Sequence, residues 1–129
     1  TKAFQGIMEA FRLPKSNEEE KSIRKKAVRK ATEVAIQVPL KTMEQAAACL
    51  PLLENMILHG NPNSISDATV GVLCVKTAIQ GAGLNVLINA ATLDKAALKE
   101  KYVEQANKIE QMAIPICDKL YSKVKESII

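Results

Sequence analysis

The sequence is poor in aromatic residues. It has two phenylalanines, two tyrosines and no tryptophan among 129 residues, so Ala, Val, Ile, Leu and Met must fill the core. These residues suit helix-on-helix packing, and no segment shows the pattern of a strand. The scarcity of aromatic side chains and the absence of a recognised nucleic-acid-binding motif also argue against a nucleic-acid partner. We therefore expect an all-α fold.

Cysteine is also scarce. Cys49, Cys74 and Cys117 lie far apart, form no CxxC pair and are odd in number. This pattern indicates neither a zinc site nor a disulfide framework. We expect the three thiols to be reduced and mostly buried, and we expect no metal site.

Targeting signals and common catalytic motifs are absent as well. We find no stretch with the length and freedom from charge of a membrane span, and the first residues lack the layout of a signal peptide. GxSxG, HExxH, Walker-type and GxGxxG motifs are missing. The length and an apolar content of 47% fit one domain with a packed core. We therefore expect a single-domain, soluble, cytoplasmic protein with no membrane partner.

The positive charge is concentrated in one segment. The net charge is +4, and six basic residues between Lys21 and Lys30 follow the acidic run Glu18–Glu20. Glu20 and Arg24 have the i,i+4 spacing of a supporting pair on a helix. We favour a solvated helix face. The alternative is a non-catalytic helical interaction module that binds nucleic acid or an acidic partner through this basic helix.

Apolar periodicity predicts the first three helices. Phe4, Ile7, Met8 and Phe11 form one stripe that Pro14 ends, and no capping residue precedes it, so we expect this helix to have continued upstream. A second helix is expected to begin with a capping box, either Ser16 with Glu19 or Asn17 with Glu20, and to end or kink near Val38. Its expected inward residues are Ile23, Ala27, Ala31, Val34, Ala35 and Val38.

A third helix is expected from Pro39 to Gly60, with a kink at Pro51. Its expected inward residues are Leu40, Met43, Ala47, Leu50, Leu53 and Ile57. Residues 61–67 form a polar loop, and residues 68–88 are apolar on nearly all sides, which predicts a central fourth helix.

A fifth helix is expected to open near Asp94 and to bend at Pro115. It carries two stripes with a seven-residue period, which suit a bundle or a subunit contact. The stripes are Tyr102, Ile109 and Ile116, and Ala106, Ala113 and Leu120. We expect a compact bundle of about five helices that forms a homodimer.

One face of the fourth helix combines small and polar residues. Eighteen residues at about 100° each make five full turns, so Asp67 and Asn85 share a face. The residues on this face are Asp67, Gly71, Cys74, Ala78, Gly81, Asn85 and Asn89. Such a face would leave a groove whose amides and carboxylate can bind an amide-like heterocycle.

A structural interpretation of the same face is equally open. Asp67 would then cap the fourth helix, and Asn85 and Asn89 would bond a neighbouring helix. An unbroken helix separates Asp67 from Asn85 by roughly 27 Å, too far for one small ligand. A helix break at Gly81 or Gly83, a long ligand or a second subunit would be needed, and we favour the second subunit. His59, beside Gly60, has no partner in the sequence and is interpreted as a helix C-terminal cap rather than an acid-base group.

Four segments, in this order and spacing, resemble a known family. They are AFRLPK at residues 10–15, VPL at 38–40, GNPNSISD at 60–67 and GAGLNVLIN at 81–89. Together they are similar to the formimidoyltetrahydrofolate cyclodeaminase and methenyltetrahydrofolate cyclohydrolase family over nearly the whole chain. The resemblance implies an all-helical homodimer that binds a one-carbon folate. It also implies ring closure of 5-formimidoyltetrahydrofolate with loss of ammonia, or hydrolysis of 5,10-methenyltetrahydrofolate.

The resemblance also implies a set of site residues. Asn61, Asn63 and Ser66 match the polar loop expected to border the folate, Asn85 and Asn89 match an amide pair, and Asp67 is the catalytic candidate in this chain. No cofactor beyond the tetrahydrofolate substrate is implied. The proton acceptor proposed for the family precedes the segment that matches Thr1–Phe4. We therefore expect residues 1–129 to be the C-terminal larger part of one domain, with little or no activity by themselves.

Overall fold

The computed structural model describes residues 2–128, and every regular element in that range is helical. The elements are α1 (Lys2–Phe11), α2 (Glu18–Ala48), α3 (Leu50–His59), the 3-10 turn η1 (Pro62–Ser64), α4 (Ile65–Ala90) and α5 (Ala96–Ile128). The expected all-α fold is confirmed.

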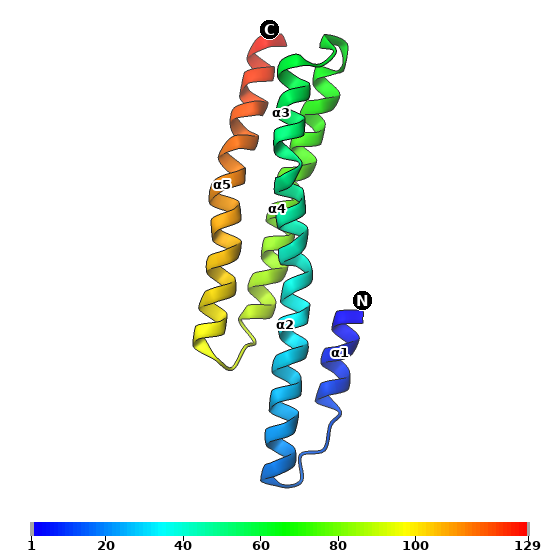
Figure 1. The fold of residues 1–129 in the computed structure, drawn as a ribbon, viewed down its shortest axis with the longest axis vertical. Helices are drawn as coiled ribbons and strands as arrows, with labels where there is room; N and C mark the ends of the chain where they lie inside the picture. The colour runs from blue at the N-terminus through cyan, green and yellow to red at the C-terminus, as the bar shows by residue number, and fades with distance from the viewer. Residues whose placement is uncertain (1, 129) are drawn as a thin grey trace.

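The helices form an elongated bundle (Figure 1). α2 and α3 run end to end, α4 returns beside them, and α5 runs back along α4. α4 packs against both α2 and α5, while α1 packs on α2. Because α2 extends beyond the ends of α4 and α5, the predicted compact shape is wrong.

The predicted boundary between the second and third helices is also wrong. α2 runs through Pro39, and the break falls at Cys49, with Pro51 in the first turn of α3. A proline inside a helix costs about 3 kcal/mol, because one backbone hydrogen bond is lost and the ring crowds the preceding turn. Leu40 and Met43 are buried on the next turn, so tertiary packing outweighs this local cost.

The buried face of α2 differs from the predicted one. Thr32, Ile36, Leu40 and Met43 are buried, whereas Ile23, Val34 and Val38 of the expected inward stripe are exposed. The inward stripe predicted for residues 40–57 is confirmed, because all its members belong to the core or pack against it. The inward stripe of the second predicted helix was misassigned because α1, rather than the bundle core, packs against that side of α2.

The start of α2 connects it to α1. Asn17 Oδ1 accepts a hydrogen bond from the Glu20 backbone N–H at 2.8 Å. Of the two predicted N-terminal caps, Asn17 is therefore confirmed and Ser16 is not. The predicted Glu20–Arg24 pair does not form. Arg24 Nε instead donates to the Phe11 carbonyl at 3.1 Å, and the guanidinium lies 5.2 Å from the centre of the Phe11 ring.

The core lies where α4 contacts α2 and α5. Its fully buried side chains come from all three helices: Ile36, Met43, Val72, Ile79, Val86 and Cys117. Ala106, Ala113 and Leu120 of α5 are buried in this core, while Ile116 lies on the surface. Of the two stripes predicted for a bundle or a subunit contact, the one formed by Ala106, Ala113 and Leu120 therefore packs inside the bundle.

α4 is apolar but only partly covered. It contains one stretch long and apolar enough to cross a membrane by length and composition, with a mean hydropathy of 1.5, which corrects the expectation that no such stretch exists. A core helix of a soluble protein has the same properties, but only 28% of this stretch is buried. One side of α4 is therefore an open apolar surface.

The cysteines differ in burial. Cys117 is buried, and burial raises the pKa of its thiol. Cys49, at the junction of α2 and α3, and Cys74, on α4, are exposed, so the expectation of mostly buried cysteines is wrong. All three thiols are free.

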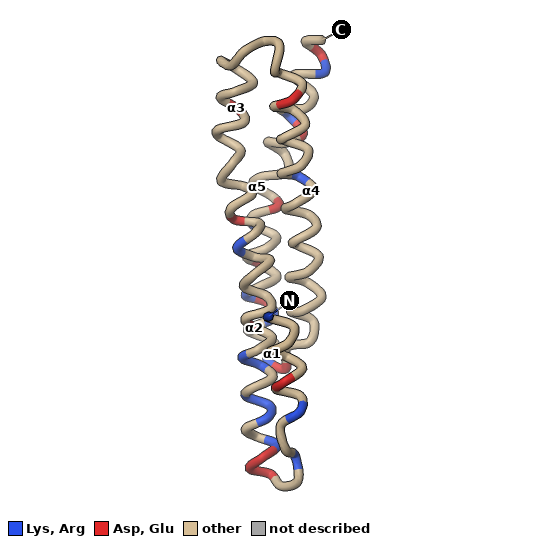
Figure 2. The backbone as a smooth tube through the Cα atoms, turned by 90° about the vertical axis from the view of Figure 1, so that its right-hand side faces the viewer, with Lys and Arg blue, Asp and Glu red and all other residues tan. Residues whose placement is uncertain are grey.

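An ion-pair cluster fastens the loop between α4 and α5 to α2. Asp94, expected at the start of the last helix, lies two residues before it. Its carboxylate accepts hydrogen bonds from Arg29 Nε at 2.7 Å and Nη2 at 2.6 Å, and Lys25 lies 3.4 Å away. The Arg29 guanidinium holds the pKa of the Asp94 carboxyl well below its usual range. The basic end of α2, seen in Figure 2, is therefore partly neutralised rather than wholly solvated.

Asp94→Asn is expected to lower the melting temperature at neutral pH. Because folding lowers the pKa of Asp94, the ion pair stabilises the protein above the ordinary aspartate pKa of about 3.9 and loses its effect as the pH falls through the lower folded value. Thermal unfolding from pH 7 to pH 3 should show a gap between wild type and variant that narrows below about pH 4.

Glu104→Gln is the matched control. It breaks an exposed pair with Lys108, at 2.9 Å, that joins two positions of the same helix. Such exposed pairs contribute little to stability. An effect of Asp94→Asn no larger than that of the control would contradict a fastening role for Asp94.

Candidate functional site

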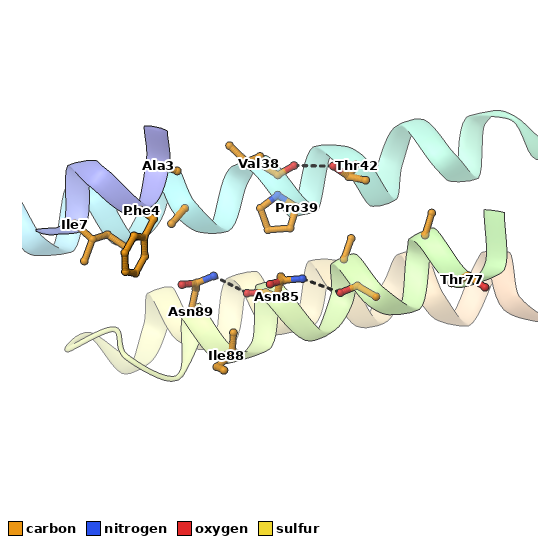
Figure 3. A pocket seen from close by; sticks show the side chains of 14 residues that line it. Ala3, Phe4, Ile7, Val38, Pro39, Thr42, Thr77, Asn85, Ile88 and Asn89 are labelled. Carbon is orange, nitrogen blue, oxygen red and sulfur yellow. Dashed lines mark hydrogen bonds between the residues drawn. The ribbon is translucent and has the colours of Figure 1, made fainter. Parts of the chain in front are cut away.

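A groove of about 650 Å³ lies between α1, α2 and α4 (Figure 3). α1 and α2 form one wall, and α4 forms the other. The lining residues are Ala3, Phe4, Ile7, Ala35, Val38, Pro39, Thr42, Thr77, Ala78, Gly81, Ala82, Asn85, Ile88 and Asn89. Ligand pockets commonly have volumes of about 300–1,000 Å³, so the groove can hold a small organic molecule.

Two amides on α4 are the main polar groups of the groove. Asn85 Nδ2 donates to the Gly81 carbonyl at 3.0 Å, and Asn89 Nδ2 donates to the Asn85 carbonyl at 2.8 Å. Both bonds are to the same helix, so the alternative interpretation, in which these amides bond a neighbouring helix, is wrong. In Figure 3 the two side chains lie one turn apart and point from α4 toward α2. With each Nδ2 engaged, Oδ1 is the atom that can accept a hydrogen bond from a ligand.

The remaining walls are mostly apolar. Phe4 and Ile7 of α1 lie opposite Asn85 and Asn89, and Pro39 faces the same space from α2 (Figure 3). Phe4 is 61% exposed and presents an aromatic ring to this opening. The Thr42 hydroxyl is engaged with the Val38 carbonyl at 3.2 Å. The site thus combines apolar and aromatic walls with two amide acceptors.

Small residues of α4 keep the groove open. A methyl group at Gly81 would meet no atom within 4 Å, so free space adjoins this position. Ala78, Gly81, Asn85 and Asn89 line the same groove, which confirms for four of the seven residues the prediction that they share one face along a groove.

The other three residues of that face lie outside the groove. Gly71 faces α3, because a methyl group there would lie 2.9 Å from Leu53 Cδ2. Cys74 is exposed. Asp67 lies in the first turn of α4, at the opposite end from Asn85 and Asn89.

The polar loop is therefore remote from the groove within one chain. α4 is a single helix from Ile65 to Ala90, which excludes the alternative of a helix break at Gly81 or Gly83. Asp67 and Asn85 are separated by roughly 27 Å along it. Asn61, Asn63 and Ser66 lie at the same end as Asp67. The structure brings together Asn85 and Asn89 but not the residues of the loop.

The side chains at the start of α4 have different roles from those expected. Ser64 occupies the N-cap position, so the interpretation of Asp67 as the cap is wrong. The Asp67 side chain is exposed. Asn61 Oδ1 accepts a hydrogen bond from the Asn63 N–H at 3.0 Å and thereby caps η1. A carboxylate in the first helical turn is stabilised by the helix dipole and remains available to a partner in solution.

His59 is the last residue of α3 and is exposed, but Gly60 occupies the C-cap position, so the interpretation of His59 as the cap is wrong. Gly60 ends the helix, and its N–H donates to the Met56 carbonyl at 2.9 Å. His59 does not line the groove.

The groove also contains residues that the sequence did not indicate. Phe4 and Ile7 were assigned to an apolar helix stripe, Val38 to the inward face and end of the second helix, and Pro39 to the start of the third. Phe4 and Val38 are large apolar side chains that remain exposed, which is visible only in the folded chain. None of the lining residues is titratable in the neutral range, and the described residues contain no group of three His, Cys, Asp or Glu able to hold a metal ion.

The sequence matches a known protein family over most of its length. A family model described as Formiminotransferase-cyclodeaminase matches residues 1–108. The chain is 33% identical over 126 residues to a methenyltetrahydrofolate cyclohydrolase from Methylorubrum extorquens, covering 98% of this chain and 61% of that protein. It is 33% identical over 112 residues to the formimidoyltransferase-cyclodeaminase of Mus musculus, covering 87% of this chain and 21% of that protein. The counterpart from Dictyostelium discoideum is 36% identical over 109 residues, covering 84% and 19%.

Proposed function

The chain belongs to the formiminotransferase-cyclodeaminase family, and from this we propose that the protein is an enzyme of folate one-carbon metabolism that acts on a C–N bond of a tetrahydrofolate. The reaction is either cyclodeamination of 5-formimidoyltetrahydrofolate to 5,10-methenyltetrahydrofolate and ammonia or hydrolysis of 5,10-methenyltetrahydrofolate. The chain spans 61% of the cyclohydrolase and 21% of the mouse enzyme, so the proposal concerns the whole protein.

The observation that carries the proposal is the pair of amide acceptors in the apolar groove. A reduced pterin presents a flat heterocycle with N–H donors along its edge. Asn85 Oδ1 and Asn89 Oδ1 can accept from those donors, while the Phe4 ring contacts the flat face. All three residues lie within the part of the chain that matches the family model.

Both reactions depend on proton transfer, and neither changes the oxidation level of the one-carbon unit. We therefore propose that the enzyme needs no cofactor beyond its folate substrate and no metal. Because the groove residues offer no acid-base group, Asp67 is our candidate for that role in this chain. We also propose that the enzyme is a cytoplasmic homodimer that binds neither membranes nor nucleic acid.

The test is to assay the full-length protein with both folates and to compare Asn85→Leu with wild type in that protein. Leucine keeps the size of the side chain but removes the acceptor, so a substrate N–H is left unpaired. This should raise KM or lower kcat/KM by about 10- to 100-fold, equivalent to about 1–3 kcal/mol. The melting temperature should change little, because the Asn85 amide is exposed and bonds only its own helix.

Asn107→Leu provides the control, since it makes the same change at an exposed amide on α5, outside the groove. Wild-type protein that turns over neither folate would contradict the proposed function. Turnover of only one folate would identify the reaction. Equal kinetic constants for Asn85→Leu and wild type would exclude the groove as the pterin site.

A further inference from the structure

The face of α2 that lines the groove continues beyond it toward the start of the helix. Ala35, Val38 and Thr42 line the groove and recur at spacings of three and four residues, which places them on one face. The same spacing continues through positions 31 and 28 to Arg24. We call residues 24, 28, 31, 35, 38 and 42 the α2 line. Arg24 is its only charged member.

The Arg24 side chain lies close to one end of the groove. Ile7 of α1 lines the groove, and Phe11 follows it by one helical turn, about 6 Å. Arg24 Nε donates to the Phe11 carbonyl at 3.1 Å, and the guanidinium lies 5.2 Å from the centre of the Phe11 ring. The guanidinium is therefore about one helical turn beyond the end of the groove.

This guanidinium is held in place and still has donors to offer. Arg24 is half-buried, and its Nε is engaged by Phe11, which leaves the Nη1 and Nη2 donors for a ligand. No carboxylate among residues 2–128 forms an ion pair with Arg24. Glu20, one turn away, accepts instead from the Ser16 N–H at 2.7 Å. A fixed guanidinium binds a carboxylate well, because its planar donors match the two oxygens and little side-chain freedom is lost on binding.

A tetrahydrofolate carries its negative charge at the end opposite to the pterin. A methylene-amino group, a benzoyl ring and an amide join the pterin to a glutamate with two carboxylates. Bonds of about 1.3–1.5 Å give this tail an extended length of roughly 13 Å. A pterin bound by the amides of α4 therefore places the carboxylates well outside the groove.

The position of Arg24 matches this length. Pro39 lies opposite Asn85 in Figure 3, and because α2 and α4 run antiparallel, Asn89 is level with Ala35. Residues 35 and 24 are roughly 16 Å apart along α2. The pterin ring and the extended tail together span this distance.

We propose that Arg24 binds a carboxylate of the glutamate tail and thereby sets the direction in which the folate lies in the groove. The inference deepens the proposed function and rests on it for the identity of the ligand. In the opposite direction the α2 line continues through Gln45 and Cys49 and gains no charge. Lys76, on the neighbouring part of α4, pairs with Asp118 of α5. Charge complementarity therefore favours a tail that runs toward Arg24.

Other basic residues at this end of α2 do not share the position of Arg24. Lys25 and Arg29 both pair with Asp94, and Arg29 lies about 140° around the helix from Arg24. Lys26 is exposed and lies about 160° around the helix from Arg24. Lys26 thus carries the same charge nearby on α2 but faces away from the groove.

Two ligands that differ only in the charge of the tail test the inference without any assay of turnover. They are tetrahydrofolate and its diamide, in which both glutamate carboxylates are carboxamides. Their dissociation constants are measured by anaerobic isothermal titration calorimetry on the full-length protein. Wild type should bind tetrahydrofolate about 10- to 100-fold more tightly than the diamide, the range expected for hydrogen bonds between charged groups. Arg24→Gln should bind the two ligands with similar affinity.

The affinity for the diamide reports whether the groove is intact in each variant. Lys26→Gln is the control and should keep the wild-type preference for tetrahydrofolate. Equal weakening of both ligands by Arg24→Gln would mean that Arg24 only holds α1 in place, and would overturn the proposal. A preference that survives in Arg24→Gln, or that Lys26→Gln also abolishes, would do the same. So would a wild-type protein that binds both ligands equally well. Wild-type protein that binds neither ligand would instead contradict the proposed function.

Discussion

Asp67→Asn is expected to lower turnover of the folate substrate by about 10²–10⁴-fold, the range that a positioned acid-base group contributes. The substitution keeps the shape of the side chain and removes its negative charge and its ability to take up and release a proton. The carboxylate is exposed, and Ser64 rather than Asp67 occupies the N-cap of α4. Loss of its interaction with the helix dipole costs only about 0.3–1 kcal/mol, so the melting temperature should fall by a few degrees at most.

Steady-state kinetics on both folates and thermal unfolding of the same samples measure the two effects separately. Glu54→Gln is a suitable control, because it removes another exposed carboxylate, from α3, without touching the start of α4. A fall in melting temperature with unchanged turnover per folded molecule would identify Asp67 as a purely structural residue. The acid-base group would then have to be sought elsewhere in the protein.

Ala113→Asp is expected to prevent folding. Ala113 is 0% exposed in the core between α4 and α5, so an aspartate there would be a buried carboxylate without a partner. Burying an unpaired charge costs at least several kcal/mol, comparable with the whole stability of a domain, about 5–15 kcal/mol. Circular dichroism at neutral pH should show loss of helical signal, and the protein should lose its cooperative thermal transition.

Met112→Asp places the same charge on the adjacent residue, where the side chain is 59% exposed. This variant should keep its helicity and unfold within a few degrees of wild type, since surface substitutions usually change stability by less than about 0.5 kcal/mol. Similar behaviour of the two variants would mean that α5 does not pack through Ala113 as described.

Local sequence signals predicted many of the helices and their ends. The stripe from Phe4 to Phe11, the Asn17 cap and the end of α3 at Gly60 were all recognisable, because caps, turns and apolar periodicity act over a few residues. The prediction failed at Pro39, where local propensity favours a boundary. Burial of Leu40 and Met43 keeps α2 continuous there.

Only one wall of the groove could be predicted from the sequence. Asn85, Asn89 and the small residues before them are on one helix, so their spacing alone places them on a common face. The opposite wall, with Phe4 and Pro39, comes from segments far away in the sequence. No local pattern indicates that α1 lies against α2 with Phe4 exposed toward α4.

The sequence by itself thus determined that the chain is all-helical and that one helix face combines two amides with small residues. Both follow from local sequence, because helix formation and side-chain direction depend on neighbours within one or two turns. Tertiary structure alone decided which apolar stripes are buried. It placed Ala113 in the core and left Leu84 exposed, although both belong to regular apolar patterns. It also formed the groove beside Asn85 and kept Asp67 at the far end of an unbroken α4, because packing between distant segments depends on the shapes and areas of whole helices.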